Sequence, residues 1–225
     1  MLYDITILFM LPGLLLGLWA QMRVKSAYAK YSRVPTRAGL PANEAVCRLL
    51  RQNGAEQITV TETAGELTDH FDPRTDTLRL SQGVYHSTSV AALGIAAHEA
   101  GHALQKQQHY PFLSLRTALV PVVNIGSSLS WPIFLAGLIF SWEPLMTAGI
   151  ILFAAVVLFT LITLPVEIDA SRRAMAMLSG SGYLTAEEEK GAKSVLTAAA
   201  LTYVASFVSA MMQLLRLLAL SRRRD

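Results

Sequence analysis

The segment Ala96-Ala97-His98-Glu99-Ala100-Gly101-His102 carries the pattern H-E-x-x-H inside an apolar run that extends from Val90 to Leu104. On a helix, residues i and i+4 lie on one face, so His98 and His102 can bind the same metal ion. Glu99 points about 100° away from His98 around the helix axis. From there its carboxylate can reach a water molecule at the metal rather than the metal itself. The pattern predicts a helix over about residues 88–107 that combines a metal site with a general base.

The alternative is that both histidines are hydrogen-bonded core residues and that Glu99 lies on a solvated face. Apart from these three residues, the run from Val90 to Leu104 is apolar or glycine. Two imidazoles and a carboxylate are costly to bury in such a helix unless they have partners. The sequence therefore favours the metal site.

A catalytic zinc site needs a third protein ligand and leaves the fourth position open for water. His109 lies seven residues after His102, about 10 Å further along a continuous helix, which is too far unless the helix ends early. His70 and His86 precede the helix and remain candidates. Glu167 is the best candidate, because two apolar spans separate it from His102. Two consecutive spans form a hairpin, which returns the chain to the same side of the membrane.

Two residues near Glu167 have expected roles of their own. Asp169 lies on the opposite helix face and is expected to pair with Arg172 or Arg173. Ser171 lies four residues after Glu167, on the same face, where it could support a metal ligand.

The composition predicts a mainly α integral membrane protein. Hydrophobic residues make up 52% of the 225 residues and charged residues only 16%, whereas a soluble domain has about 25% charged residues. Three stretches are long enough to span a bilayer as helices, since a span needs about 20 apolar residues. These stretches are Leu2 to Ala20, Thr117 to Phe140 and Leu145 to Pro165, and the weaker stretch Val195 to Leu215 makes the expected number three to four.

The basic residues indicate the orientation in the membrane. The first span is followed by Arg23, Lys25, Lys30, Arg33 and Arg37. By the positive-inside rule, the segment after the span lies in the cytoplasm, so we expect a multi-pass plasma-membrane protein with a cytoplasmic active site. The net charge of +3 is thereby explained without nucleic-acid binding. The arginines at 222–224 conflict with this orientation if the last helix also spans.

The chain divides into four predicted parts. Residues 1–20 form a transmembrane anchor, residues 21–116 a soluble part, residues 117–165 a transmembrane hairpin, and residues 166–225 a third-ligand helix followed by a C-terminal membrane-associated helix. In the soluble part, Pro41 to Gln52 is expected to be a helix. Strands near Ile58–Thr61 and Leu78–Ser81 are expected to form a small antiparallel sheet. The lone Cys47 cannot form an internal disulfide.

Four segments together resemble the YugP-like family of bacterial membrane-bound neutral zinc metallopeptidases: Leu67 to Arg74, Leu78 to Ser81, Ala91 to Gln105 and Glu167 to Ala174. The resemblance covers nearly the whole chain. It implies a zincin-like cytoplasmic domain, one Zn²⁺ per chain bound by His98, His102 and Glu167, and a catalytic Glu99. More distantly, the chain is similar to the membrane CAAX prenyl protease and heat-shock membrane protease families. Those carry an acidic residue at the position of Ser171.

We therefore expect a zinc endopeptidase that cleaves peptides or membrane proteins at the bilayer. The strand Thr77 to Ser81 is expected to hold an extended substrate by strand addition. His109 and Tyr183 are candidates for a second oxyanion donor.

Two other functions remain open from the sequence. One is a non-catalytic membrane adaptor or chaperone stabilised by zinc, although such a protein would not need Glu99. The other is hydrolysis of a non-peptide amide or ester. A transporter is disfavoured, because the spans carry almost no internal charge.

Overall fold

The computed structural model describes residues 5–222 of the chain. The first four residues of the predicted anchor and the last three residues of the arginine-rich tail lie outside this range. The chain forms two compact units. The first contains Met1–Gln21, Ser114–Pro165 and Leu201–Asp225, and the second contains Met22–Leu113 and Val166–Ala200.

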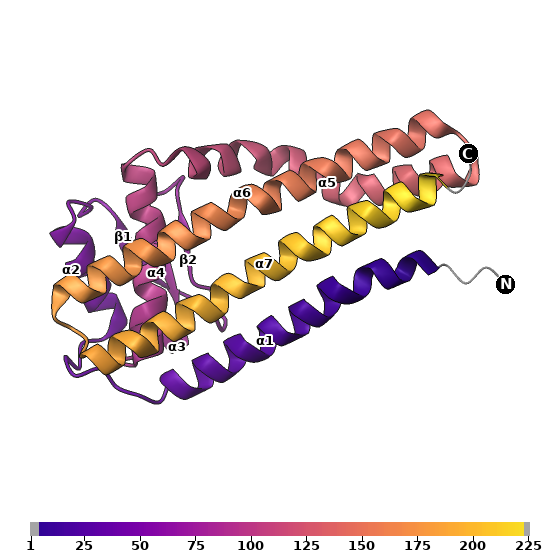
Figure 1. Cartoon of the computed structure of the whole chain (residues 1–225). Coiled ribbons are helices and arrows are strands. Elements are labelled where there is room, and N and C mark those ends of the chain that lie inside the picture. Colours follow the sequence, from indigo (N-terminus) through magenta and orange to yellow (C-terminus); the bar gives the residue numbers. More distant parts are fainter. Residues whose placement is uncertain (1–4, 223–225) are drawn as a thin grey trace. The chain divides into compact units, whose positions relative to one another are not determined.

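The first unit is made of long apolar helices. After a short 3-10 helix, Ile5–Met10, the long helices are α1 (Leu11–Tyr31), α5 (Pro111–Ile139), α6 (Glu143–Ser181) and α7 (Ala186–Arg222) (Figure 1). Within residues 5–222, four helices are long and apolar enough to cross a membrane, with mean hydropathies from 1.6 to 2.7. The prediction of a mainly α membrane protein with three to four spanning helices is confirmed.

Helices α5 and α6 pack closely against each other in the first unit. A Cβ atom at Gly149 of α6 would lie 2.8 Å from the backbone oxygen of Ser130 and 2.7 Å from the Cβ of Phe134, both on α5. A side chain at residue 149 would force the two helices apart. The two spans are therefore neighbours, as a hairpin requires.

Helix α6 does not end where the sequence suggested. A separate short helix was expected after Pro165, but α6 continues through this proline to Ser181. Proline removes one backbone hydrogen bond and crowds the preceding turn, but Ile162 and Val166 on either side of it are buried, and such packing stabilises the helix. With 39 residues and a rise of about 1.5 Å each, α6 is about 58 Å long. It therefore exceeds the roughly 30 Å thickness of a bilayer core and continues from the first unit into the second.

The second unit contains a three-stranded mixed sheet. Its strands are β1 (Thr59–Thr63), β2 (His70–Asp72) and β3 (Thr77–Ser81), in the order β1-β3-β2. β2 and β3 form an antiparallel hairpin, but β1 and β3 are parallel. The expectation of an antiparallel sheet is wrong for this pair. Because the chain reverses direction twice between β1 and β3, the two strands run the same way. In the sheet, β3 lies between β1 and β2 and pairs with both of them.

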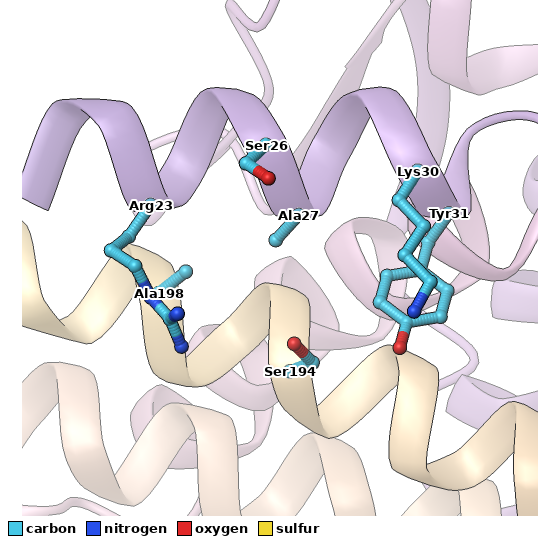
Figure 2. Close-up of a pocket in the computed structure, with 7 residues that line it drawn as sticks. All are labelled: Arg23, Ser26, Ala27, Lys30, Tyr31, Ser194 and Ala198. Atoms are coloured by element: carbon cyan, nitrogen blue, oxygen red, sulfur yellow. The ribbon is translucent and has the colours of Figure 1, made fainter.

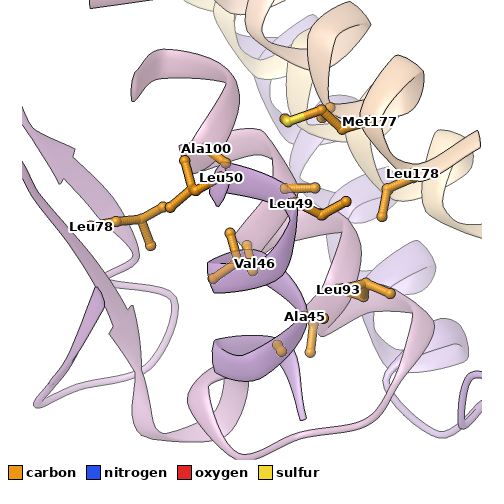
Figure 3. Close-up of a cluster of buried hydrophobic side chains, with 14 of the residues drawn as sticks. Ala45, Val46, Leu49, Leu50, Leu78, Leu93, Ala100, Met177 and Leu178 are labelled. Atoms are coloured by element: carbon orange, nitrogen blue, oxygen red, sulfur yellow. The ribbon is translucent and has the colours of Figure 1, made fainter. Parts of the chain in front are cut away.

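The core of the second unit packs around two helices. These are α2 (Ala42–Gln52) and α4 (Val90–Gln107), and both lie close to the predicted ranges. Ser89 caps α4, since its hydroxyl accepts a hydrogen bond of 3.2 Å from the backbone N–H of Ala92. Figure 3 shows leucines of α2 between the sheet, α4 and the later part of α6. This core fixes α4, which carries the H-E-x-x-H pattern.

Candidate metal centre

Three side chains from two helices meet in the second unit. His98 and His102 come from α4 and Glu167 from α6. Glu167 Oε2 lies 3.2 Å from Nε2 of His98 and 3.7 Å from Nε2 of His102. One donor atom of each residue lies within 4.8 Å of the others. Ligands of a tetrahedral zinc at bond lengths near 2.1 Å lie about 3.3 Å apart, so the cluster has the dimensions of a metal site.

Gly101 allows the two helices to approach each other. A Cβ atom at residue 101 would lie 3.0 Å from the backbone carbon and 3.1 Å from the Cα of Ala170, on α6. It would lie still closer to the carbonyl oxygen of Ala170. Only glycine fits this contact. The contact brings Glu167, which lies one turn before Ala170 on α6, within reach of the two histidines on α4.

The three donors are largely removed from solvent. The exposed fractions of the side chains are 14% for His98, 12% for His102 and 3% for Glu167. Burial lowers the pKa of His102, but hydrogen bonding to Glu167 and the charge of Glu99 outweigh it, so this pKa lies above its ordinary value. A buried carboxylate between two imidazoles is an arrangement that a divalent cation would stabilise.

Each histidine is oriented through its other ring nitrogen. Ser171 Oγ lies 3.1 Å from Nδ1 of His98, and Gln105 Oε1 lies 3.0 Å from Nδ1 of His102. With Nδ1–H as the donor in both contacts, both Nε2 atoms would offer a lone pair to a bound metal on the side that faces Glu167. Ser171 thus contacts a histidine of the cluster, as expected for a residue on the same helix face as Glu167.

A buried network holds Gln105 in place. Its amide nitrogen donates to the backbone oxygen of Val166 at 2.8 Å and to Asp169 Oδ2 at 3.0 Å. Asp169 also accepts from Arg172 at 2.6 Å and from Arg173 at 2.5 Å. The expected pairing of Asp169 is confirmed, with both arginines rather than one. The network connects His102 to the helix turn that carries Glu167.

Glu99 lies beside the cluster and faces the sheet. It is 9% exposed, and its Oε2 accepts a hydrogen bond of 3.0 Å from the backbone N–H of Phe71 in β2. The start of β2 is fixed by Asp69, which accepts hydrogen bonds from the backbone and hydroxyl of Ser81 at 2.8 and 3.0 Å. Burial raises the pKa of Asp69 above its ordinary value. The Phe71 N–H thus orients Oε2 of Glu99. The other carboxylate oxygen, Oε1, is left to take part in the reaction.

The remaining candidates lie elsewhere. His70 is exposed in β2, with Nδ1 2.8 Å from the backbone oxygen of Thr68. The exposed His86 lies 3.7 Å from Glu62, and His109 lies in the turn after α4, with φ 51°. Among the described residues, the His, Cys, Asp and Glu side chains grouped closely enough for a metal are His98, His102 and Glu167. Tyr183 packs against the hydrophobic core.

Sequence reasoning missed three contributors to the site: Gln105, Phe71 and Gly101. Gln105 carried a usable signal, because it is a polar residue three positions after His102 and therefore lies beside it on the same helix face. Gly101 also lies within the pattern, as a helix-interior glycine. Phe71 acts through its backbone N–H, which no side-chain pattern reveals.

Comparison with known proteins identifies the family of this chain. A family model described as "Putative neutral zinc metallopeptidase" matches residues 6–222, and the chain belongs to this family. It is also similar to the "Putative membrane protease YugP" of Bacillus subtilis (strain 168), with 45% identity over 201 residues, which make up 89% of each chain. No solved structure matches it. The resemblance stated from the sequence is confirmed.

The residues present fit the zinc that the family implies. Two imidazole nitrogens and one carboxylate are a ligand set of catalytic zinc sites. The Nδ1 atoms of both histidines are already hydrogen-bonded, as they are in catalytic zinc sites.

Ser171 offers a test of ligand orientation. We expect Ser171→Ala to weaken zinc affinity by about tenfold or more, because loss of a hydrogen bond to a ligating histidine typically has this effect. Competition with a zinc chelator of known affinity measures it. Ser179→Ala is the control, since Ser179 lies on the same helix as Ser171 but its hydroxyl donates to Glu189 of α7, outside the cluster. Equal affinities for both variants would contradict the role of Ser171.

Proposed function

We propose that this protein is a membrane-embedded zinc endopeptidase. His98, His102 and Glu167 bind one Zn²⁺ per chain, and Glu99 is the general base. The observation that carries the proposal is the buried cluster of the three donors within 4.8 Å, with a second carboxylate, that of Glu99, on the residue after His98. The family membership supports a zinc-dependent peptidase, and the four apolar helices support a membrane setting.

The arrangement around Glu99 suits hydrolysis. When bound, zinc supplies a Lewis acid that lowers the pKa of a water toward about 7. Glu99 accepts the proton of the attacking water and later delivers it to the leaving amine. Its Oε2 is held by the Phe71 N–H, so Oε1 is the atom for the transferred proton. The largely buried walls limit competing water and strengthen the electrostatic interactions.

The strand β2 is the better surface for an extended peptide. The expected strand, Thr77–Ser81, is wrong for this role, because β3 is paired on both sides, by β1 and by β2. β2 is an edge strand, paired with β3, and its Phe71 N–H reaches Glu99. An edge strand can pair with a substrate backbone on its open side, where in β2 the Phe71 N–H is already bonded to Glu99. A peptide along β2 would lie next to the general base.

The proposed location is the cytoplasmic face of the plasma membrane. The basic residues from Arg23 to Arg37 follow the apolar part of the first candidate span, which ends at Ala20, and they lie at the start of the unit that contains the cluster. The positive-inside rule favours this unit in the cytoplasm.

Zinc content together with hydrolysis tests the proposed function. Detergent-purified wild-type protein is expected to contain about one zinc per chain and to cleave unfolded casein. Chelation should abolish cleavage, and added zinc should restore it. Glu167→Ala should lose both zinc and cleavage, because two imidazoles alone bind zinc weakly.

The control is Glu143→Ala, which removes an exposed carboxylate at the start of the same helix. It should keep zinc and cleavage. Zinc retained by Glu167→Ala would exclude this ligand set. Stoichiometric zinc in wild type without cleavage of casein or of membrane-protein fragments would instead support a zinc-stabilised adaptor.

A further inference from the structure

A polar cavity lies between α1 and α7 in the second unit (Figure 2). Its volume is about 190 Å³. Both helices contribute polar and small side chains to its walls. The lining residues are Arg23, Ser26, Ala27, Lys30, Tyr31, Ser194 and Ala198. None of them belongs to the His-His-Glu cluster.

Two positive charges border this cavity. Arg23 and Lys30 are seven residues apart, so they lie on one face of α1, about 10 Å from each other along the axis. Figure 2 shows both side chains extending toward α7. Within residues 5–222, neither has a carboxylate within 4.0 Å, and the Lys30 ammonium lies 5.0 Å from the centre of the Tyr31 ring. The positive charge at the cavity is therefore not neutralised by the protein.

Hydroxyl groups line the space between the two charges. Ser26 and Tyr31 come from α1, and Ser194 comes from α7. In the described part of the chain, no protein group is hydrogen-bonded to these three hydroxyls. Ala27 and Ala198 keep the space open because their side chains are small. Two cations with hydroxyl donors between them form a site for an anion with several oxygens.

The sequence positions point to a membrane-bound anion. Arg23 follows the apolar part of α1 by three residues. The α7 residues from 201 onward belong to the first unit, which contains the apolar parts of the long helices. Large apolar side chains on the preceding turns of α1, including Leu15, Leu18 and Met22, are exposed. Lipid phosphates lie at this depth, just beyond the hydrocarbon core. Basic pockets between spanning helices bind anionic headgroups elsewhere.

We propose that this cavity binds the phosphate of an anionic phospholipid headgroup. The volume is below the roughly 300 Å³ at which pockets for drug-sized ligands begin. It suits a phosphate with part of its headgroup, while the acyl chains lie along the exposed apolar face of α1. Arg23 and Lys30 bind the phosphate oxygens as cations, and Ser26, Tyr31 and Ser194 donate hydrogen bonds. The proposal does not depend on zinc or on peptide hydrolysis.

Native mass spectrometry of the full chain in detergent tests this site. The probes are phosphatidylglycerol and phosphatidylcholine at equal concentration. Wild type is expected to retain phosphatidylglycerol preferentially. The double variant Arg23→Gln/Lys30→Gln should weaken phosphatidylglycerol binding by about thirtyfold. Each of the two charges contributes roughly tenfold or less to this loss. Lys25→Gln/Arg33→Gln removes the same charge from the same flank, but neither side chain lines the cavity, so it should bind within about twofold of wild type.

Two further arms identify the site and its ligand. Ser194→Leu keeps every charge but fills the cavity, and it should reduce phosphatidylglycerol binding as strongly as one charge removal. Millimolar inorganic phosphate should not displace the lipid. Equal losses in the two double variants, or unchanged binding in Ser194→Leu, would overturn the cavity in favour of diffuse surface charge. Displacement by phosphate alone would overturn the lipid in favour of a soluble anion. Thermal unfolding midpoints close to wild type would confirm that each of the three variants is folded.

Discussion

Glu99→Gln is expected to reduce kcat for peptide hydrolysis by about 10² to 10⁴-fold, while zinc per chain stays unchanged. Glutamine has nearly the shape of glutamate, and its amide oxygen can still accept the hydrogen bond from Phe71 N–H. What it lacks is a basic oxygen that can take a proton from water. The variant therefore separates general-base catalysis from folding and from metal binding.

Single-turnover cleavage of a fluorescent unfolded substrate, together with zinc analysis of the same sample, measures this effect. Glu62→Gln is the control, since it neutralises a partly exposed carboxylate on β1 that faces His86. It should leave kcat within about twofold of wild type, as expected for a surface substitution. Unchanged hydrolysis in the Glu99 variant would exclude Glu99 as the base.

Gly101→Ala is expected to destabilise the second unit by about 1–3 kcal/mol, the usual cost of overpacking, and to abolish tight zinc binding. Alanine in a helix interior would otherwise stabilise by about 1 kcal/mol relative to glycine. Here the added methyl group would lie 3.0 Å from the backbone carbon of Ala170. A backbone atom cannot move aside as a side chain does, so α4 and α6 must separate. Separation moves Glu167 away from both histidines.

Gly94→Ala is the matched control for this prediction. It lies on the same helix, but its added Cβ would meet the Cβ of Ala192 at 3.5 Å, an ordinary contact. We expect it to keep zinc and to be as stable as wild type or more so. Thermal unfolding in detergent and competition for zinc measure both effects. If the two alanine variants behave alike, close contact between α4 and α6 is not required for the metal site.

The three residues of the cluster could be predicted from the sequence for two separate reasons. His98 and His102 are grouped by local helix geometry, which needs no knowledge of the tertiary fold. Glu167 is distant in sequence, but a hairpin of two spans must return the chain to the side from which it entered. The supporting contacts of Gln105 and Phe71 could not be predicted in this way. They depend on which turns of α6 and β2 face α4, and this is fixed by packing.

The spanning helices could be predicted from composition. The order of the strands and the continuation of a helix through a proline could not. Long apolar stretches indicate spanning helices directly. The place of β3 between β1 and β2 was missed, because strand order depends on long-range contacts that period-2 patterns do not contain. The continuation of α6 through Pro165 was missed, because a proline weakens a helix without always ending it.

The division of the second unit into two chain segments has a consequence for biosynthesis. Residues 22–113 are made first, and residues 166–200, which complete the unit, follow only after the apolar stretch between them. Glu167 follows His98 by 69 residues, which corresponds to on the order of ten seconds of translation. During that time the histidine pair exists without its carboxylate partner. The nascent chain therefore stays incomplete at this centre until the ribosome has passed the hairpin, so assembly of the cluster is timed by synthesis of the membrane segment.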